Sequence, residues 1–312
     1  MNDTMLSTVC LRDAEGELEA RFMPGAGMLC CSLRHRGKEL LAQNAGVETY
    51  VRRGKTMGIP LLYPWANRLA AFNYDVAGRA VVVPHDRTRV ALDGNGLPIH
   101  GVIGGRLEWE PVRSSPVAAD SLVARLSWND ARPELFEIFP FRHDLEYRAV
   151  LAANRLTVSV TVHASAEDYV PVAFGFHPYL SLPRVARESW QVQLPAMRHL
   201  VLDAQQIPSG PERVHAAQSF ALGELELDDG FDQVAQGARF EVTAGGRVVT
   251  LELIEGYPCA QVFARRGGEF ICFEPMTAPA NALVSGSGLR VLAPGERLRA
   301  TFAVSVQDGG GE

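Results

Sequence analysis

The feature that most constrains the fold is a strict alternation of apolar and polar side chains over residues 155–163. The apolar positions of this segment are, in order, Leu156, Val158, Val160 and Val162. Successive side chains of a strand point to opposite faces, so this period of two predicts a strand with one buried face. The same alternation recurs over residues 144–149 and 298–306, which predicts that strands extend over most of the chain.

A hairpin is predicted from residues 240–244 and 247–253, because Gly245-Gly246 between them can adopt the positive φ of a tight turn. The 19 prolines and 29 glycines are scattered, and no window of twelve or more residues keeps a helical period. The chain is therefore predicted to be all-β with few short helices. Many short antiparallel strands need sheets stacked face to face, since one open sheet would expose an apolar face, so we expect a large β-sandwich.

The domain organisation is predicted to be simple. The chain has 312 residues, of which 47% are hydrophobic, and this is enough to bury a large core. No internal repeat, linker or shift of composition marks a boundary. We expect one domain over residues 1–312, with residues 309–312 as a loose tail.

The charge balance, the N-terminus and the cysteines restrict the partners and the compartment that we expect. The 30 Lys and Arg residues against 36 Asp and Glu give a net charge of −6 without a basic stripe, so no nucleic-acid partner is expected. Residues 1–5 lack the start of a signal peptide and the apolar runs are too short to cross a bilayer, so we expect a cytoplasmic protein without a membrane partner. Five cysteines without a C-x-x-C pattern are predicted to be reduced packing residues.

Five polar clusters stand out from the strand pattern, and each places a polar group beside aromatic or turn residues. They lie at residues 64–68, 99–101, 174–179, 227–231 and 273–277. Such a mixture suits sugars, whose C–H faces pack on aromatic rings while their hydroxyls need a few aimed hydrogen bonds.

Two of these clusters contain candidates for acid/base chemistry. Pro178 restricts the backbone of His177 to extended geometry, and an imidazole fixed among aromatic rings suits a general acid, although it could also be a hydrogen-bonded structural residue. Glu274 follows the apolar run 270–273 and precedes Pro275, which predicts a carboxylate at the end of a buried strand. That carboxylate is either a general base or the partner of an arginine such as Arg68.

Four blocks of the chain together resemble one known family. They are Pro-Trp-Ala-Asn-Arg-Leu at 64–69, His-Gly at 100–101, Gly-Phe-His-Pro-Tyr at 175–179 and Glu-Pro-Met-Thr-Ala-Pro-Ala-Asn-Ala-Leu at 274–283. In sequence and in order they resemble the aldose 1-epimerase, or galactose mutarotase-like, family. The resemblance extends from about residue 20 to about residue 306.

This resemblance implies an antiparallel β-supersandwich with a shallow sugar cleft on one sheet, and no cofactor or metal. Glu274 would be the catalytic base and His177 the catalytic acid. The residues that the resemblance places around the sugar are His100, Arg68, Asn67, Asp228 and Gln261. Asp229 is an alternative to Asp228, and ordinary structural roles remain open for the others: a turn for Asn67, a strand surface for Gln261, a loop end for His100 and a salt bridge for Arg68.

The predicted function is thus that of a mutarotase acting on a free aldose, as a monomer or homodimer. One alternative is a hexose-6-phosphate 1-epimerase, for which Arg52-Arg53, Lys55 and Arg265-Arg266 could bind phosphate. Another is a non-catalytic sugar-binding protein on the same fold. A zinc hydrolase built on His100, His177 and Glu274 lacks a compact H-x-x-x-H pair, and a glycosidase would have to pair Glu274 with Asp228.

Overall fold

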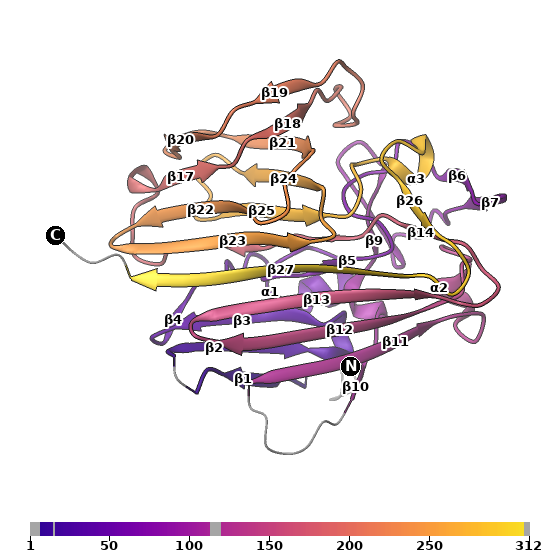
Figure 1. The fold of residues 1–312 in the computed structure, drawn as a ribbon, viewed down its shortest axis with the longest axis horizontal. Helices are drawn as coiled ribbons and strands as arrows, with labels where there is room; N and C mark the ends of the chain where they lie inside the picture. The colour runs from indigo at the N-terminus through magenta and orange to yellow at the C-terminus, as the bar shows by residue number, and fades with distance from the viewer. Residues whose placement is uncertain (1–6, 15, 113–119, 309–312) are drawn as a thin grey trace.

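The computed structural model describes residues 7–14, 16–112 and 120–308 (Figure 1). Strands dominate these residues, which confirms the all-β prediction. The described helices are short: α1 (Gly46–Arg53), α2 (Pro133–Phe136), α3 (Ala282–Ser285) and the 3₁₀ turns η2 (Pro24–Ala26), η3 (Gly104–Arg106) and η4 (Arg187–Ser189). None of the helices in this part of the chain is long and apolar enough to cross a membrane. Residues 1–5 and the expected tail at 309–312 lie outside the described residues.

The largest sheet has nine strands and contains all three alternating segments (Figure 1). Its strands, in spatial order, are β10 (Glu110–Pro111), β11 (Ser121–Trp128), β12 (His143–Ala152), β13 (Arg155–Ala164), β27 (Arg297–Asp308), β23 (Arg247–Glu255), β22 (Ala238–Ala244), β17 (Gln191–Leu194) and β20 (Gln218–Ala221). Every neighbouring pair is antiparallel. As the alternation predicts, the apolar positions of β13 are fully buried.

The second large sheet has eight strands and positions the candidate site. Its strands are β19 (Arg213–His215), β18 (Met197–Leu200), β21 (Leu227–Asp232), β24 (Cys259–Ala264), β25 (Ile271–Met276), β15 (Gly175–Phe176) and β5 (Leu61–Leu62), with β16 (Tyr179–Leu180) also paired to β25. The sequence predicted Glu274 at the end of a strand because Pro275 follows it. β25 instead continues through Pro275 to Met276, so Glu274 lies within the strand.

Smaller sheets complete the fold. One has four strands, β1 (Val9–Arg12), β2 (Leu18–Met23), β3 (Leu29–His35) and β4 (Lys38–Glu39). Three strand pairs are formed by β6 (Asn73–Val76) with β7 (Arg79–Val82), β8 (Val90–Leu92) with β9 (Pro98–Val102), and β14 (Val170–Val172) with β26 (Arg290–Leu292).

The predicted hairpin is confirmed with its register. Ala244 of β22 pairs with Arg247 of β23, so the loop contains two residues. Gly245 and Gly246 both have positive φ, at 58° and 70°. A two-residue turn with positive φ at both positions matches the right-handed twist of the strands it joins, which explains why glycine occupies both.

Aromatic side chains join the sheets into one core. Phe176 of β15 packs on Phe302 of β27 with ring centroids 4.9 Å apart, which connects the eight-stranded sheet to the nine-stranded one. Tyr147 of β12 contacts Phe176 and also Phe22 of β2, at 6.1 Å and 6.2 Å. The four-stranded sheet therefore packs against the same nine-stranded sheet, and the arrangement is the predicted β-supersandwich.

The cysteines are free thiols, as expected from their number and spacing. Cys30, Cys259 and Cys272 are buried, and Cys10 and Cys31 are partly buried. Cys272 is the one that lies beside the candidate site described below.

The contact between the large sheets predicts a specific stability difference. Phe302→Ala should lower the free energy of unfolding by about 3–5 kcal/mol, because it removes a fully buried ring that touches Phe176 and leaves a cavity. Gln307→Ala, at an exposed position of the same strand, should change it by less than about 0.5 kcal/mol. Urea denaturation of both variants measures this, and equal effects would show that the sheets do not depend on this contact.

Candidate functional site

The strand register of the eight-stranded sheet determines which residues face away from the core. Gly230 pairs with Gln261, and Gln261 pairs with Glu274, so the three residues point to the same face. Phe273, the neighbour of Glu274, points to the opposite face and packs on Phe240 of the nine-stranded sheet at 5.4 Å. Glu274 therefore lies on the outer face of this sheet, away from the nine-stranded sheet.

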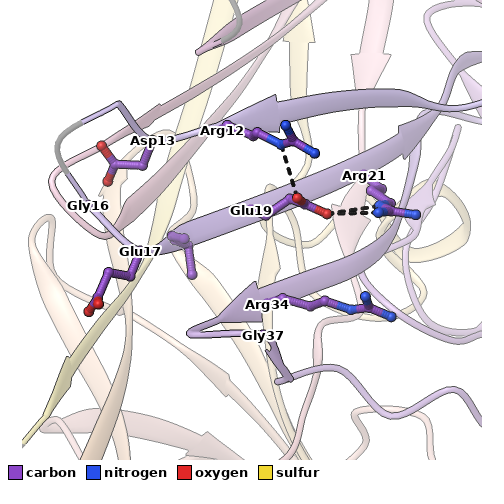
Figure 2. Close-up of a pocket in the computed structure, with 9 residues that line it drawn as sticks. Arg12, Asp13, Gly16, Glu17, Glu19, Arg21, Arg34 and Gly37 are labelled. Atoms are coloured by element: carbon purple, nitrogen blue, oxygen red, sulfur yellow. Dashed lines mark hydrogen bonds and ion pairs between the residues drawn. The ribbon is translucent and has the colours of Figure 1, made fainter.

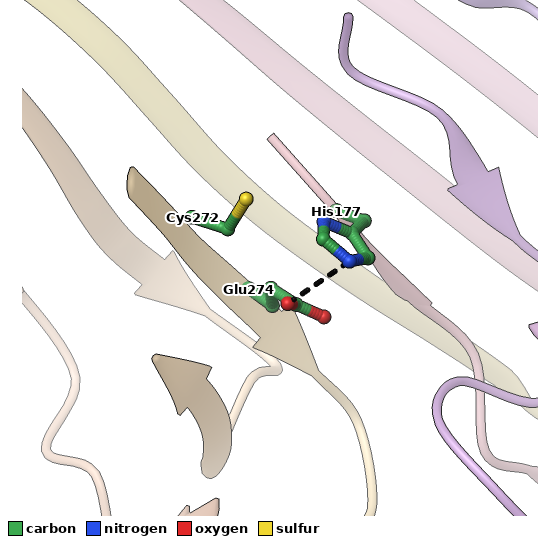
Figure 3. A group of neighbouring side chains, drawn as sticks. All are labelled: His177, Cys272 and Glu274. Carbon is green, nitrogen blue, oxygen red and sulfur yellow. Dashed lines mark ion pairs between the residues drawn. The ribbon is translucent and has the colours of Figure 1, made fainter. Parts of the chain in front are cut away.

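His177 meets Glu274 on this face (Figure 3). It lies between β15 and β16, both of which pair with β25, and its backbone N–H donates to the carbonyl of Pro60. Its Nε2 lies 3.2 Å from Oε1 of Glu274. Glu274 is 2% exposed and His177 5% exposed, so the pair is almost completely removed from bulk water.

Tyr179 also contacts the imidazole. Its ring stacks on that of His177 with centroids 4.3 Å apart, and its hydroxyl lies 3.2 Å from the same Nε2. The hydroxyl is also 2.7 Å from that of Thr56, which fixes the tyrosine from the other side. Sequence reasoning did not assign a role to Tyr179, although it closes the Gly-Phe-His-Pro-Tyr block.

Burial shifts the proton affinity of both members of the pair. It raises the pKa of the Glu274 carboxyl well above its usual range, and the nearby Asp228 adds to this while Arg68 opposes it. Burial lowers the pKa of the His177 imidazole well below its usual range, with a further contribution from His100. Both groups therefore favour their neutral forms, and one proton can pass between oxygen and nitrogen over the 3.2 Å contact.

Asn67 and His100 lie on two segments that are joined by backbone hydrogen bonds. The backbone N–H of His100 donates to the carbonyl of Asn67 at 2.9 Å, and Arg68 forms a β-bridge with Ile99. Asn67 and His100 both have left-handed φ values, 53° and 62°. Such conformations are uncommon for residues other than glycine, and Asn and His are among the residue types that adopt them most often.

Gly101 allows these two segments to approach. A Cβ atom there would overlap the backbone carbonyl of Tyr63, and its φ is 68°. The approach brings the His100 ring to the His177 ring, with centroids 5.5 Å apart. The Nδ1 atom of His100 is buried, and burial lowers the pKa of the imidazole to about 3, so His100 is neutral near neutral pH.

Arg68 forms an ion pair with Asp93, a partner that the sequence pattern did not indicate. Its Nε donates to Asp93 at 2.8 Å, and its Nη1 donates to the Asn67 side chain at 3.2 Å. Burial alone would raise the pKa of Asp93, but backbone N–H groups and the guanidinium together lower it. The alternative in which Arg68 neutralises Glu274 by an ion pair is not what the structure shows, since Arg68 pairs with Asp93 and the side chain in contact with Glu274 is His177.

Asn281 connects the arginine segment to the glutamate block. Its backbone N–H donates to the carbonyl of Arg68, and its side-chain oxygen accepts from the N–H of Ala70. The sequence contained this residue in the Glu-Pro-Met-Thr-Ala-Pro-Ala-Asn block, but nothing in the pattern indicated that it positions Arg68.

The structure separates Asp228 from Asp229. Asp228 pairs with Phe263 on the outer face and accepts a hydrogen bond of 2.7 Å from the buried Gln261 side chain. Asp229 points to the other face, where His199 lies 3.1 Å from it. Burial raises the pKa of Asp228. Of the two aspartates, only Asp228 shares a face with Glu274.

The predicted site residues are thus gathered on one side of the eight-stranded sheet. Glu274 and His177 are in contact, Gln261 lies beside Glu274 in register and holds Asp228, and His100 contacts His177. The Arg68 guanidinium donates to the Asn67 side chain. It is also near enough to Glu274 and Asp228 to oppose in part the rise that burial causes in their pKa values.

Two cavities are found outside the contact between Glu274 and His177. A pocket of about 340 Å³ lies on the four-stranded sheet (Figure 2), where Glu19 forms ion pairs with Arg12 and Arg21, and it contains none of the predicted site residues. A cavity of about 10 Å³ lies between α1 and β9 and is bordered by Thr56 and His100. It has room for about one water molecule.

Comparison with known proteins points to the family indicated by the sequence motifs. The family model described as aldose 1-epimerase matches residues 10–305. Among curated proteins, the uncharacterized protein YphB of Escherichia coli (strain K12) is 25% identical over 278 residues, covering 82% of this chain and 88% of its own.

Two solved structures show the same fold. A galactose mutarotase-like protein from Clostridium acetobutylicum has a TM-score of 0.81 at 17% identity, with 96% of this chain and 95% of that chain covered. The Slr1438 protein from Synechocystis sp. PCC 6803 has a TM-score of 0.76 at 24% identity, with 97% and 96% covered.

The buried carboxyl group predicts a pH-dependent stability difference. The pKa of Glu274 is raised by folding, so the folded protein binds this proton more tightly than the unfolded chain, whose ordinary value is 4.5. The contribution of this group to stability is therefore present at low pH and is lost as pH rises above 4.5 toward the folded pKa. Glu274→Gln cannot lose a proton, so its stability should gain on that of the wild type as the pH rises above 4.5 through the neutral range.

Denaturant unfolding across this range measures the difference. Glu269→Gln, an exposed position shortly before β25, is the matched control and should follow the wild type at every pH. A wild type and a Glu274→Gln variant whose stabilities run parallel with pH would contradict the raised pKa.

Proposed function

Because this chain belongs to the aldose 1-epimerase family, we propose that it interconverts the α and β anomers of a free aldose by opening and reclosing the sugar ring. One observation carries the proposal: a carboxyl and an imidazole 3.2 Å apart, on the outer face of a sheet that also presents Asp228 and Gln261. An acid and a base that exchange roles are all that this reaction requires.

The chemistry of a hemiacetal assigns the roles. Glu274 accepts the proton of the anomeric hydroxyl while protonated His177 donates to the ring oxygen. The bond between C1 and the ring oxygen breaks, and an open-chain aldehyde forms. Rotation about C1–C2 presents the other face of the carbonyl, and reclosure with the roles reversed gives the other anomer and restores both groups.

The close spacing of the pair suits this substrate. The anomeric hydroxyl oxygen and the ring oxygen are bonded to the same carbon, so the acid and the base must act at neighbouring points. Glu274 and His177 meet this requirement because Oε1 of the carboxyl and Nε2 of the imidazole are 3.2 Å apart. Transfer of the shared proton from Glu274 to His177 makes the carboxylate base and the imidazolium acid together. The two opposite charges then lie side by side, in a site that disfavours isolated charges.

The remaining predicted residues are proposed to orient the sugar. Asp228, Gln261 and Arg68 present hydrogen-bonding groups around the pair, and His100, neutral and in contact with His177, can direct the ring oxygen. Phe263 contacts the His177 ring at 5.9 Å and offers an aromatic surface to the C–H groups of a sugar.

The phosphosugar alternative has less support. Arg52, Arg53, Lys55, Arg265 and Arg266 are all exposed, as expected of a solvated surface, and Arg52 already pairs with Glu48. The non-catalytic alternative is opposed by the presence of both the acid and the base in contact. The rate and binding measurements that follow distinguish both alternatives from an epimerase of free sugars.

Loss of either member of the pair should abolish the acceleration. Glu274→Gln and His177→Asn should each lower the rate of approach to anomeric equilibrium by a factor on the order of 100 or more, because each removes a proton-transfer group. Polarimetry or NMR of freshly dissolved α-glucose, α-galactose and their 6-phosphates measures this rate against the uncatalysed reaction.

Sugar binding to both variants, followed by ligand NMR, is the control that separates lost chemistry from lost binding. A wild type that binds sugars without accelerating any of them would favour the sugar-binding protein. Acceleration of the 6-phosphates alone would establish the phosphosugar epimerase.

The two neighbouring aspartates provide a matched pair. Asp228→Asn should lower kcat/KM about tenfold, which corresponds to about 1.4 kcal/mol of lost interaction with the sugar and with Gln261. Asp229→Asn should leave kcat/KM near the wild-type value, because this side chain points to the other face. Initial rates over a range of sugar concentrations measure both, and a larger loss in Asp229→Asn would contradict the assignment of faces.

A further inference from the structure

We infer that His177, Cys272 and Glu274 form a binding site for a soft divalent cation of the Zn²⁺ class, whose occupancy stops the acid/base chemistry. The inference goes beyond the proposed reaction, which needs no metal. It is carried by the position of one cysteine that the reaction does not use.

The three side chains lie close together on the outer face, with His177 and Glu274 in contact and Cys272 beside them (Figure 3). Their nitrogen, sulfur and oxygen atoms all lie within 4.8 Å of one another. Cys272 and Glu274 are two residues apart on β25 and therefore point to the same face, and His177 reaches them from the segment between β15 and β16.

The donor set is that of zinc. Zn²⁺ binds imidazole nitrogen, thiolate sulfur and carboxylate oxygen, and three protein ligands leave a fourth position for water or a sugar hydroxyl. The charges also balance, since a thiolate and a carboxylate together neutralise a divalent cation. The thiol proton and the proton shared by Glu274 and His177 would pass to solvent when the ion binds.

Burial would enclose a bound ion, and it also raises the pKa of the Cys272 thiol, so the thiolate would form only as the cation replaces its proton. Cys272 is 0% exposed, Glu274 2% and His177 5%. A bound ion would thus be held away from bulk water. Its attraction to the two anionic ligands is stronger in this buried environment than it would be in water. It would also occupy both catalytic groups at once, because neither the carboxylate nor the imidazole could carry a proton while coordinated.

Cys272 separates the cation site from the proposed reaction. Its thiol donates or accepts no proton in the mechanism, and Cys272→Ser and Cys272→Ala remove the sulfur ligand while keeping Glu274 and His177. Cys259 is the matched control, because it is another buried cysteine of the same sheet and lies outside the group of three.

The test uses Co²⁺ as a spectroscopic probe and Zn²⁺ as the inhibitor. Co²⁺ added to the whole protein should bind one to one and give the near-ultraviolet charge-transfer band of a thiolate ligand. The band should be absent in both Cys272 variants and retained in Cys259→Ser. Calorimetric affinity for Zn²⁺ should fall at least about 100-fold in Cys272→Ser, since even the outer partners of metal ligands contribute 10–100-fold.

The activity readout is independent of the spectrum. Zn²⁺ should stop the acceleration of anomer exchange by the wild type, a chelator should restore it, and Cys272→Ala should keep its activity in the presence of Zn²⁺. A wild type without a thiolate band, or a band that survives in Cys272→Ser, overturns the inference. The spectrum decides the cation site even if no sugar is found to react, so failure here is distinguishable from failure of the proposed function.

Discussion

The contact between Glu274 and His177 depends on the alternation of one strand. In β25 the side chain of Phe273 enters the core between the two large sheets, and the next side chain, Glu274, is turned to the outer face. Because the inward residues are locked by aromatic packing, the outward residues cannot shift register without exposing the core. The sandwich thus fixes a carboxyl group that would otherwise be unfavourable to bury, and it places His177 beside it.

The surroundings of the pair are built from segments that contribute by position more than by chemistry. Gly101 permits a close approach of β9 to Tyr63. Asn281 donates a backbone hydrogen bond to Arg68, and Asp93 forms an ion pair with the arginine. These contacts engage Arg68 elsewhere, so in the described part of the chain the ionisable side chain in contact with Glu274 is His177. The carboxyl and the imidazole therefore depend on each other for charge balance, which is the condition for passing a proton in either direction.

The sequence alone predicted the sandwich well because a period of two and paired turn glycines are local signals, and both are visible in β13 and the β22–β23 hairpin. The motifs predicted which residues belong to the candidate site, but not how those residues are arranged in space. The partner of Arg68 and the face of Asp228 depend on cross-strand register, which joins residues far apart in the chain. For the same reason no local pattern indicated that Cys272 lies beside the pair.

The most direct test of the central claim, ring opening by this pair, follows the fate of the anomeric oxygen. An aldose that carries a heavy oxygen isotope at C1 would be mixed with the protein, and NMR would follow anomer exchange while mass spectrometry follows the label. Ring opening breaks the bond from C1 to the ring oxygen, so the account predicts rapid exchange of the anomers with the label retained in both. Loss of the label to water at the rate of anomer exchange would show that the bond to the anomeric oxygen breaks instead, and would contradict the account.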